Sequence, residues 1–289
     1  MKAINLSALG LLAPVHLLLL AVIAVPSLAV FWLSLNASTY GVSPEFVGLA
    51  NYWTVLSDSY FWRSALNTFV VVNVVVYAEI LLGLGLALLF VGKVPCRNLL
   101  FAIILMPYAV SEVVGVLAWK ILMNPSYGAI SRTLAEIGLS LNWSASPTQG
   151  LALVSIISIW HHLPFTFLLL YAALLAIPRS LYEAASIDGA GALQTFVRIT
   201  LPLLVPALLI TVIFRLVFAF RMFSEVWLLT KGGPARLTEV LAVYLYQGAF
   251  RNGDFGTASA TGWLMVLSSL GVASFYLYQM HRRIAGGHA

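Results

Sequence analysis

Two adjacent histidines lie in the middle of a long apolar stretch of this sequence. His161 and His162 follow Trp160 and precede Pro164, and Ser158 lies one helical turn earlier. Imidazole and hydroxyl groups can bind a polar cargo or move a proton, and at membrane depth such groups usually mark a functional site or a buried pair. Adjacent residues point about 100° apart on a helix, so we expect one of the two histidines to face lipid or another helix.

An arginine lies deep in the next long apolar stretch. Arg215 is 13 residues beyond Pro202, which is about 20 Å along a helix and past the centre of a bilayer. A charged side chain there needs a partner charge or a cavity. Glu79, Glu112 or a carboxylate of another subunit could be that partner. If Arg215 faces a cavity instead, we expect an anionic cargo, such as a phosphorylated or sulfonated sugar. The sequence leaves both alternatives open.

Other kinds of chemistry have little support. Arg221 and Glu225 are four residues apart, as in a structural ion pair on one helix. No nucleophile–base constellation and no metal-ligand spacing accompanies the histidines, so we predict neither an enzyme nor a metal site. Cys96 is the single cysteine, which excludes an intrachain disulfide. No G-x-x-x-x-G-K-[ST] loop is present, so any ATPase would be another chain.

The composition indicates a membrane protein. Of the 289 residues, 61% are hydrophobic and 9% are charged, against about 25% charged in soluble domains. The net charge of +5 does not indicate a nucleic-acid partner, because the basic residues are scattered and lie mostly at the ends of apolar stretches. We predict an all-α integral membrane fold and one transmembrane domain over residues 1–289.

Six stretches are long and apolar enough to cross a bilayer as helices. The first also resembles a signal peptide, with Lys2 before the run Leu17 to Leu20, but the run is long and no small-x-small cleavage site follows it. We therefore expect it to be a retained span. The six predicted spans are roughly 9–35, 64–91, 99–123, 150–176, 201–230 and 257–280.

The basic residues also predict an orientation. More Lys and Arg lie in the segments that share a side with the N-terminus, which by the positive-inside rule places both termini in the cytoplasm. The inner set is Lys2, Lys93, Arg97, Arg179, Arg198, Arg282 and Arg283, against Arg132, Lys231, Arg236 and Arg251 outside.

The inner loop at 177–202 has its own helical signals. Ser180 is a candidate N-cap, and Glu183 in the first turn would suit the helix dipole. Gly189 is placed to end this short helix, and a second amphipathic stretch, Leu193 to Ile199, leads to Pro202 in the first turn of the next span. The loop therefore predicts a compact helix–turn–helix on the cytoplasmic side.

The same loop carries a motif at fixed spacing. Glu183-Ala184-Ala185 is followed by three residues, Gly189, nine residues and Ile199-Thr200-Leu201-Pro202. This resembles the E-A-A loop of ABC importer permeases, and the chain is most similar to the maltose-type and glycerol-phosphate-type sugar permeases. The large periplasmic insertion of the maltose permease is absent. Further resemblances are Gly48-Leu49-Ala50-Asn51-Tyr52, Leu66-Asn67-Thr68, Leu82-Gly83-Leu84, Met106-Pro107, Trp119-Lys120, Thr230-Lys231-Gly232-Gly233-Pro234, Tyr246, Ala249-Phe250 and Phe255-Gly256.

The resemblance implies the type I importer fold, with six transmembrane helices in a bacterial inner membrane. It also implies that the E-A-A loop is a coupling helix docked on an ATPase subunit, so that Glu183 pairs with a basic group there and Ala184 and Ala185 permit close contact. The implied coupling residues are Glu183, Ala184, Ala185, Asp188, Gly189, Ile199, Leu201 and Pro202. This chain would bind no cofactor, since ATP and Mg would lie on the ATPase.

The implied partners are a second permease subunit, an ATPase dimer and a solute-binding protein. By position, the sugar site at mid-membrane would comprise Ser158, His161, His162, Phe165, Arg215 and Phe218. Gly232, Gly233 and Pro234 are candidates for contact with the binding protein, although a plain Gly/Pro turn explains them too.

An ion-gradient-driven transporter is the rival function. Such a protein needs carboxylates within the membrane and commonly shows repeat symmetry. Glu79 and Glu112 are available, but no repeat is visible and the E-A-A loop would have no role. We therefore expect the permease subunit of an ATP-driven sugar importer.

Overall fold

The computed structural model describes residues 6–286, with side chains described for 13–278. Lys2 lies outside the described residues, and the side chains of Arg282 and Arg283 are not described. Within the described range the chain forms α1 (Leu6–Ser34), β1 (Asn36–Ala37), β2 (Glu45–Phe46), α2 (Ala50–Ser57), α3 (Ser59–Val91), α4 (Arg97–Ala109), α5 (Glu112–Leu122), α6 (Ala129–Glu136), α7 (Pro147–Leu175), α8 (Arg179–Ile187), α9 (Ala192–Thr195), the π-helix η1 (Phe196–Thr200), α10 (Leu201–Ala219), α11 (Ser224–Leu229), α12 (Leu241–Tyr246), the π-helix η2 (Gln247–Arg251) and α13 (Phe255–Gly286).

The helical membrane architecture is confirmed. Among the described residues, five helical segments are long and apolar enough to cross a membrane: 13–34, 59–91, 147–175, 192–219 and 255–278. A sixth span exists if α4 and α5 together count as one broken span.

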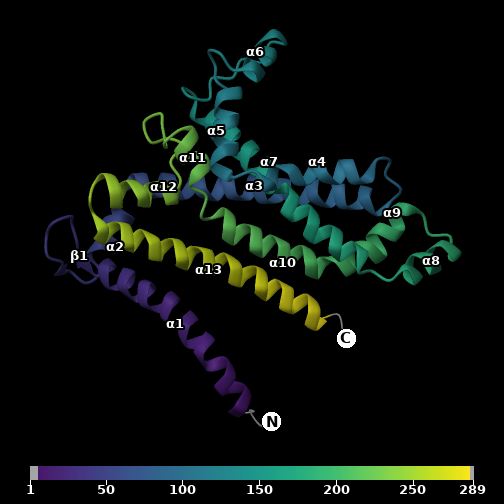
Figure 1. Ribbon diagram of the computed structural model, residues 1–289, viewed down its shortest axis with the longest axis horizontal. Helices are drawn as coiled ribbons and strands as arrows, with labels where there is room; N and C mark the ends of the chain where they lie inside the picture. Colours follow the sequence, from purple (N-terminus) through teal and green to yellow (C-terminus); the bar gives the residue numbers. More distant parts are fainter. Residues whose placement is uncertain (1–5, 287–289) are drawn as a thin grey trace. The chain divides into compact units, whose positions relative to one another are not determined.

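The stretch predicted as a span at 99–123 is not one continuous helix, because the helix axis turns by 98° between α4 and α5. Pro107 lies in the last turn of α4 and has no N–H for the helical ladder. Val110 and Ser111 then adopt extended backbone, and Ser111 is the N-cap residue of α5. The bend sends α5 away from the line of α4 (Figure 1).

The fifth predicted span, 201–230, is also too long. The helix α10 ends at Ala219, and α11 starts anew at Ser224 after four residues without helix. Arg221 and Glu225 are therefore not one turn apart on a single helix. The two salt bridges found among the described side chains are Arg215–Glu79 and Arg236–Glu239, so the predicted Arg221–Glu225 pair is wrong.

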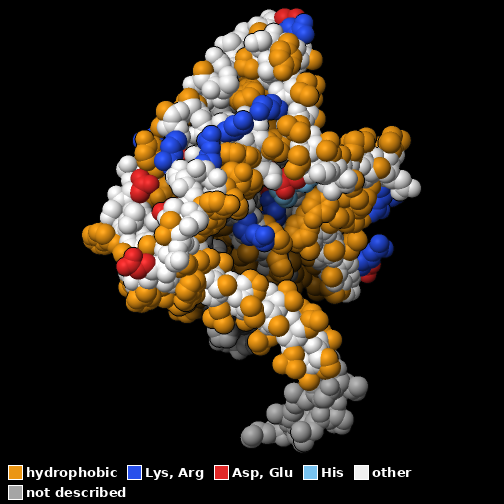
Figure 2. All heavy atoms as spheres, turned by 60° about the vertical axis from the view of Figure 1, so that its left-hand side comes forward, with side chains coloured by type: hydrophobic (Ala, Val, Ile, Leu, Met, Phe, Trp, Pro, Cys, Tyr) orange, Lys and Arg blue, Asp and Glu red, His pale blue; other side chains and the backbone are white. Residues whose placement is uncertain are grey.

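The outer surface is strongly apolar. Large hydrophobic side chains such as Leu81, Leu89 and Leu267 are more than half exposed. Hydrophobic atoms cover much of the face seen in Figure 2. A soluble monomer rarely exposes such continuous apolar surface, so this surface suits lipid and neighbouring subunits.

The chain folds into two compact units. One contains the described residues up to Phe61 and Tyr244–Val266, and the other contains Trp62–Val243 and the described residues from Leu267 onward. In the second unit α7 is central and packs against α4, α5, α10 and α11. A cluster of edge-to-face and stacked rings, Phe90, Phe101, Phe167 and Tyr171, joins α3, α4 and α7.

In the first unit, residues far apart in the sequence share one hydrogen-bond network. The Nδ2 atom of Asn51 donates to the carbonyl oxygens of Ser34, at 2.9 Å, and of Asn36, at 2.8 Å. A Cβ atom on Gly256 would lie 2.5 Å from the Asn36 carbonyl oxygen. Asn51 and Gly256 belong to two of the motifs singled out in the sequence, and here they have a packing role.

The contact between α3 and α7 depends on a glycine. A Cβ atom on Gly83 would lie 2.9 Å from Cγ2 of Thr166 and 3.2 Å from the backbone nitrogen of Phe167. Gly85, two residues along the same helix, has nothing within 4 Å of the same position. The absence of a side chain at Gly83 therefore lets the two helices approach closely.

We expect Gly83→Leu to destabilise the protein and Gly85→Leu to leave its stability nearly unchanged. Overpacking of a close helix contact costs about 1–3 kcal/mol, whereas a leucine at Gly85 meets open space. The measurement is the unfolding temperature of each purified variant in detergent. Equal unfolding temperatures for the two leucine variants would contradict this role of Gly83 in the α3–α7 contact.

Candidate functional site

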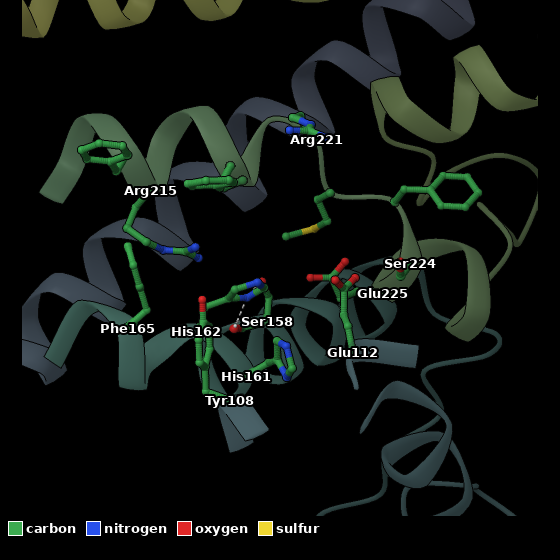
Figure 3. A pocket seen from close by; sticks show the side chains of 15 residues that line it. Tyr108, Glu112, Ser158, His161, His162, Phe165, Arg215, Arg221, Ser224 and Glu225 are labelled. Carbon is green, nitrogen blue, oxygen red and sulfur yellow. Dashed lines mark hydrogen bonds between the residues drawn. The ribbon is translucent and has the colours of Figure 1, made fainter. Parts of the chain in front are cut away.

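A cavity of about 630 Å³ opens in the second unit, within the size range of small-molecule sites. Its walls come from α4, α5, α7, α10, α11 and the residues between α10 and α11 (Figure 3). The lining residues are Tyr108, Glu112, Ser158, His161, His162, Phe165, Phe214, Arg215, Phe218, Ala219, Arg221, Met222, Phe223, Ser224 and Glu225. All six residues that the sequence proposed as neighbours of a mid-membrane cargo, Ser158, His161, His162, Phe165, Arg215 and Phe218, line this one cavity.

Both histidines line the cavity, so the expectation that one of them faces away is wrong. Nδ1 of His162 lies 3.0 Å from the carbonyl oxygen of Ser158, one turn earlier on α7. A carbonyl oxygen can only accept a hydrogen bond, so Nδ1 of His162 carries the proton and donates it in this contact. In a neutral ring, Nε2 is then left without a proton and can accept a hydrogen bond. Nδ1 of His161 is buried and has no hydrogen-bond partner among the described residues.

Arg215 is paired rather than free. Its Nε and Nη2 atoms donate to the two carboxylate oxygens of Glu79, the second bond being 2.8 Å. Glu79 is fully buried, and Thr166 contributes a further contact of 3.5 Å from its hydroxyl. This fork-to-fork geometry joins α10 to α3 and balances the guanidinium charge at the cavity wall. Of the alternatives that the sequence left open for Arg215, the structure shows the Glu79 pair.

Two carboxyl groups at the cavity were not proposed as site residues. Glu112 is the first residue of α5, and Glu225 lies in the first turn of α11. Their side chains interact with each other, and the hydroxyl of Ser158 also lies close to Glu225. Figure 3 shows the two carboxyl groups together at one end of the cavity. The sequence indicates Glu112 and Glu225 only as candidate ion-pair partners, because it does not predict the helix breaks before α5 and α11 that bring both residues here.

Neighbouring contacts hold these short helices in place. Nζ of Lys120, near the end of α5, donates at 2.6 Å to the carbonyl oxygen of Leu228 near the end of α11. The helix α11 also packs against both α5 and α7. On the α4 side, the ring of Tyr108 stacks on Phe165 with centroids 6.2 Å apart. The cavity thus has a polar end with carboxyl groups and an aromatic wall.

The loop that carries the E-A-A motif forms α8, α9 and η1 at the ends of α7 and α10 (Figure 1). The helix α8 begins at Arg179 with Pro178 as N-cap and without a side-chain cap bond, so the N-cap predicted at Ser180 is wrong. Pro202 does occupy the first turn of α10, as predicted. Glu183 and Ala184 are exposed, whereas Ala185 is buried.

Gly189 ends α8 as the sequence predicts. Its φ of +71° lies in the left-handed region that glycine adopts without strain. The N–H of Ala190 donates to the carbonyl of Ala185 at 2.9 Å, and the N–H of Gly189 donates to Ser186 at 3.2 Å. This pair of bonds is a Schellman motif, which closes the C-terminus of the helix.

The loop with Gly232, Gly233 and Pro234 is anchored on α3. Nδ2 of Asn67 donates to the carbonyl oxygens of Leu237, at 2.9 Å, and Glu239, at 2.8 Å. Within the loop, the hydroxyl of Thr238 donates to the carbonyl of Gly233 at 2.7 Å. The three candidate residues therefore belong to an ordered loop that leads from α11 to α12.

A polar cavity lined by apolar helices and a helical loop that carries the E-A-A motif agree with the permease resemblance of the sequence. Residues 79–285 match the family described as "Binding-protein-dependent transport system inner membrane component". The chain belongs to this family. It is therefore a multi-pass inner-membrane permease of an ABC importer.

The chain is similar to permeases of named transport systems. It is 37% identical to the trehalose/maltose transport system permease protein MalF of Thermococcus litoralis over 92% of this chain and 91% of that protein. It is 35% identical to the sulfoquinovosyl glycerol transport system permease protein SmoG of Agrobacterium fabrum over 94% and 90%. A chain of a bacterial alginate ABC transporter, solved in complex with an alginate pentasaccharide-bound periplasmic protein, shares the fold, with a TM-score of 0.83, 23% identity and coverage of 97% and 95%.

Proposed function

We propose that this permease carries a sugar or sugar derivative through the cavity between α4, α5, α7, α10 and α11. The observation that carries the proposal is the convergence of all six candidate residues on one cavity of about 630 Å³. Tyr108 and Phe165 supply aromatic faces for a sugar ring, and Ser158 and His162 supply hydrogen-bonding groups. Two similar proteins are permeases of trehalose/maltose and sulfoquinovosyl glycerol systems, which agrees with this class of cargo.

ATP supplies the energy through a separate ATPase dimer, which holds ATP and Mg, whereas this chain binds no cofactor. Residues 177–202 are the coupling loop of a single permease domain, and α8 is the helix that docks on the ATPase. The exposed carboxylate of Glu183 is available for a basic group of that partner, and exposed Ile187 and Leu193 offer apolar contact. Asp188, Gly189, Ile199, Leu201 and Pro202 are the other residues of the proposed coupling motif. With the coupling loop on the ATPase side, both termini lie in the cytoplasm, in agreement with the positive-inside rule.

On the opposite side a solute-binding protein delivers the cargo, and a second permease subunit completes the translocation path. The ordered loop containing Gly232, Gly233 and Pro234 is the candidate contact with the binding protein. Its anchoring by Asn67 and Thr238 supports this role, because a docking loop benefits from being held in one conformation.

The test is uptake into vesicles that contain the complete importer with its binding protein. We expect labelled trehalose or maltose to accumulate with ATP when ionophores have collapsed all ion gradients. Accumulation that needs an ion gradient and ignores ATP would overturn the proposal in favour of a secondary transporter.

A further inference from the structure

The cavity's acidic end has features that the proposed function does not explain. Glu225 is 3% exposed, yet its Oε2 atom has no hydrogen-bond partner among the described residues. Nδ1 of His161, a second deeply buried polar atom, likewise has no such partner. Both side chains line the cavity. A buried polar atom without a partner is costly, so these atoms are placed to meet hydrogen-bonding groups of a bound molecule.

The chemistry of this end is that of acceptors. Glu112 and Glu225 both line the cavity and interact at close range at this end. The oxygen lone pairs of a carboxyl group accept hydrogen bonds. Nε2 of His162 adds a neutral acceptor, because its Nδ1 already donates to Ser158.

The arginines that line the cavity do not pair with the carboxyl groups at this end. Arg215 is neutralised by its bidentate contact with Glu79. Arg221 is exposed and forms no salt bridge with Glu112 or Glu225 among the described side chains. Figure 2 shows acidic, basic and histidine side chains together in a hollow of the surface within largely hydrophobic surroundings. The carboxyl pair disfavours an anion that enters the cavity, because the anion's oxygens and the carboxyl oxygens repel one another.

We propose that Glu112 and Glu225 form an acceptor subsite that selects cargo by its hydroxyl or ammonium donors and disfavours phosphorylated, sulfonated or carboxylated sugars. This inference rests on the proposed function, since it takes the cavity to hold the cargo. The anionic cargo that an unpaired Arg215 would predict is therefore replaced by a neutral or cationic sugar. Glu225 is the more important residue of the pair because it is the more deeply buried.

The test uses the complete importer in lipid nanodiscs, without binding protein, and three matched probes: trehalose, trehalose 6-phosphate and 6-amino-6-deoxytrehalose. We expect the wild type to bind trehalose and the amine, and to bind the phosphate at least about tenfold more weakly. Glu225→Gln should weaken the binding of trehalose about tenfold, since a hydrogen bond to a charged group is lost, and should reduce the discrimination against the phosphate. Glu112→Gln should also reduce the discrimination against trehalose 6-phosphate.

Glu136→Gln is the matched control, because Glu136 is exposed at the end of α6 and does not line the cavity. Equal binding of all three probes, no binding of any, or an unchanged preference in Glu225→Gln overturns the inference. A preference for the phosphate that Arg221→Gln abolishes would assign anion binding to Arg221 instead. ATP-driven sugar uptake by the same importer in sealed vesicles, with its binding protein, shows separately whether the proposed function stands.

Discussion

Glu79→Gln should be among the most damaging single substitutions in this protein. The change leaves the guanidinium of Arg215 buried and without a counter-charge, and arginine cannot lose its proton to escape. Breaking a buried ion pair from one side costs about 3–5 kcal/mol. We expect the variant to accumulate poorly in the membrane and to lose a large part of its thermal stability in detergent.

The converse substitution should be milder. Arg215→Met leaves Glu79 unpaired, but a carboxyl group can take up a proton and become neutral. The double variant Glu79→Met/Arg215→Met removes both charges and should recover much of the stability, because apolar replacements of a buried pair are often tolerated. Unfolding temperatures of the three variants test this order. If Glu79→Gln is as stable as the wild type, the pair does not hold α3 to α10.

Gly189→Val should uncouple transport without disturbing the spans. Valine in the left-handed conformation of Gly189 costs about 1–2 kcal/mol, which is roughly a 5- to 30-fold loss of the native loop conformation. The Schellman closure of α8 would then be weakened, and with it the surface that we assign to the ATPase. We expect uptake to fall about tenfold or more, with less ATPase subunit co-purifying.

Gly191→Val is the matched control for this substitution. Gly191 is two residues away, and its φ of −72° and ψ of 166° suit any residue. A Cβ atom added at either glycine would meet no other atom within 4 Å, so steric crowding cannot explain a difference between the two variants. Similar losses of uptake in both would show that the effect does not arise from the left-handed turn.

The spans and the coupling loop could be predicted from the sequence because their signals are local. Long apolar runs identify the helices, and the left-handed turn at Gly189 follows from a single glycine after a short helix. The start of α8 at Arg179 could not be predicted in this way, because the prediction relied on Ser180 as a side-chain N-cap. The helix begins earlier and has no side-chain cap.

The cavity could be predicted only in part. Ser158, His161 and Phe165 recur on one α7 segment, so helical spacing brings them together. Glu112 and Glu225 come from helices that begin after breaks at 110–111 and 220–223, and those breaks depend on tertiary packing as well as on Pro107. The hydropathy pattern does not mark either break, so the sequence alone predicted a continuous span at each place.

The partner of Arg215 shows the same limit. Three partners were open from the sequence, since no local signal relates residues 136 positions apart, as Arg215 and Glu79 are. Only the packing of α10 and α3 in the same unit selects Glu79 among them.

Photoaffinity labelling of the complete importer tests most directly whether cargo passes through this cavity. The probe is a trehalose derivative with a small photoreactive group, and the labelled peptides are identified by mass spectrometry. We expect label on peptides that contain residues 108–112, 158–165 and 214–225, and we expect excess trehalose to suppress it. Label confined to other segments, or label that trehalose does not suppress, would contradict the assignment of the cavity as the cargo site.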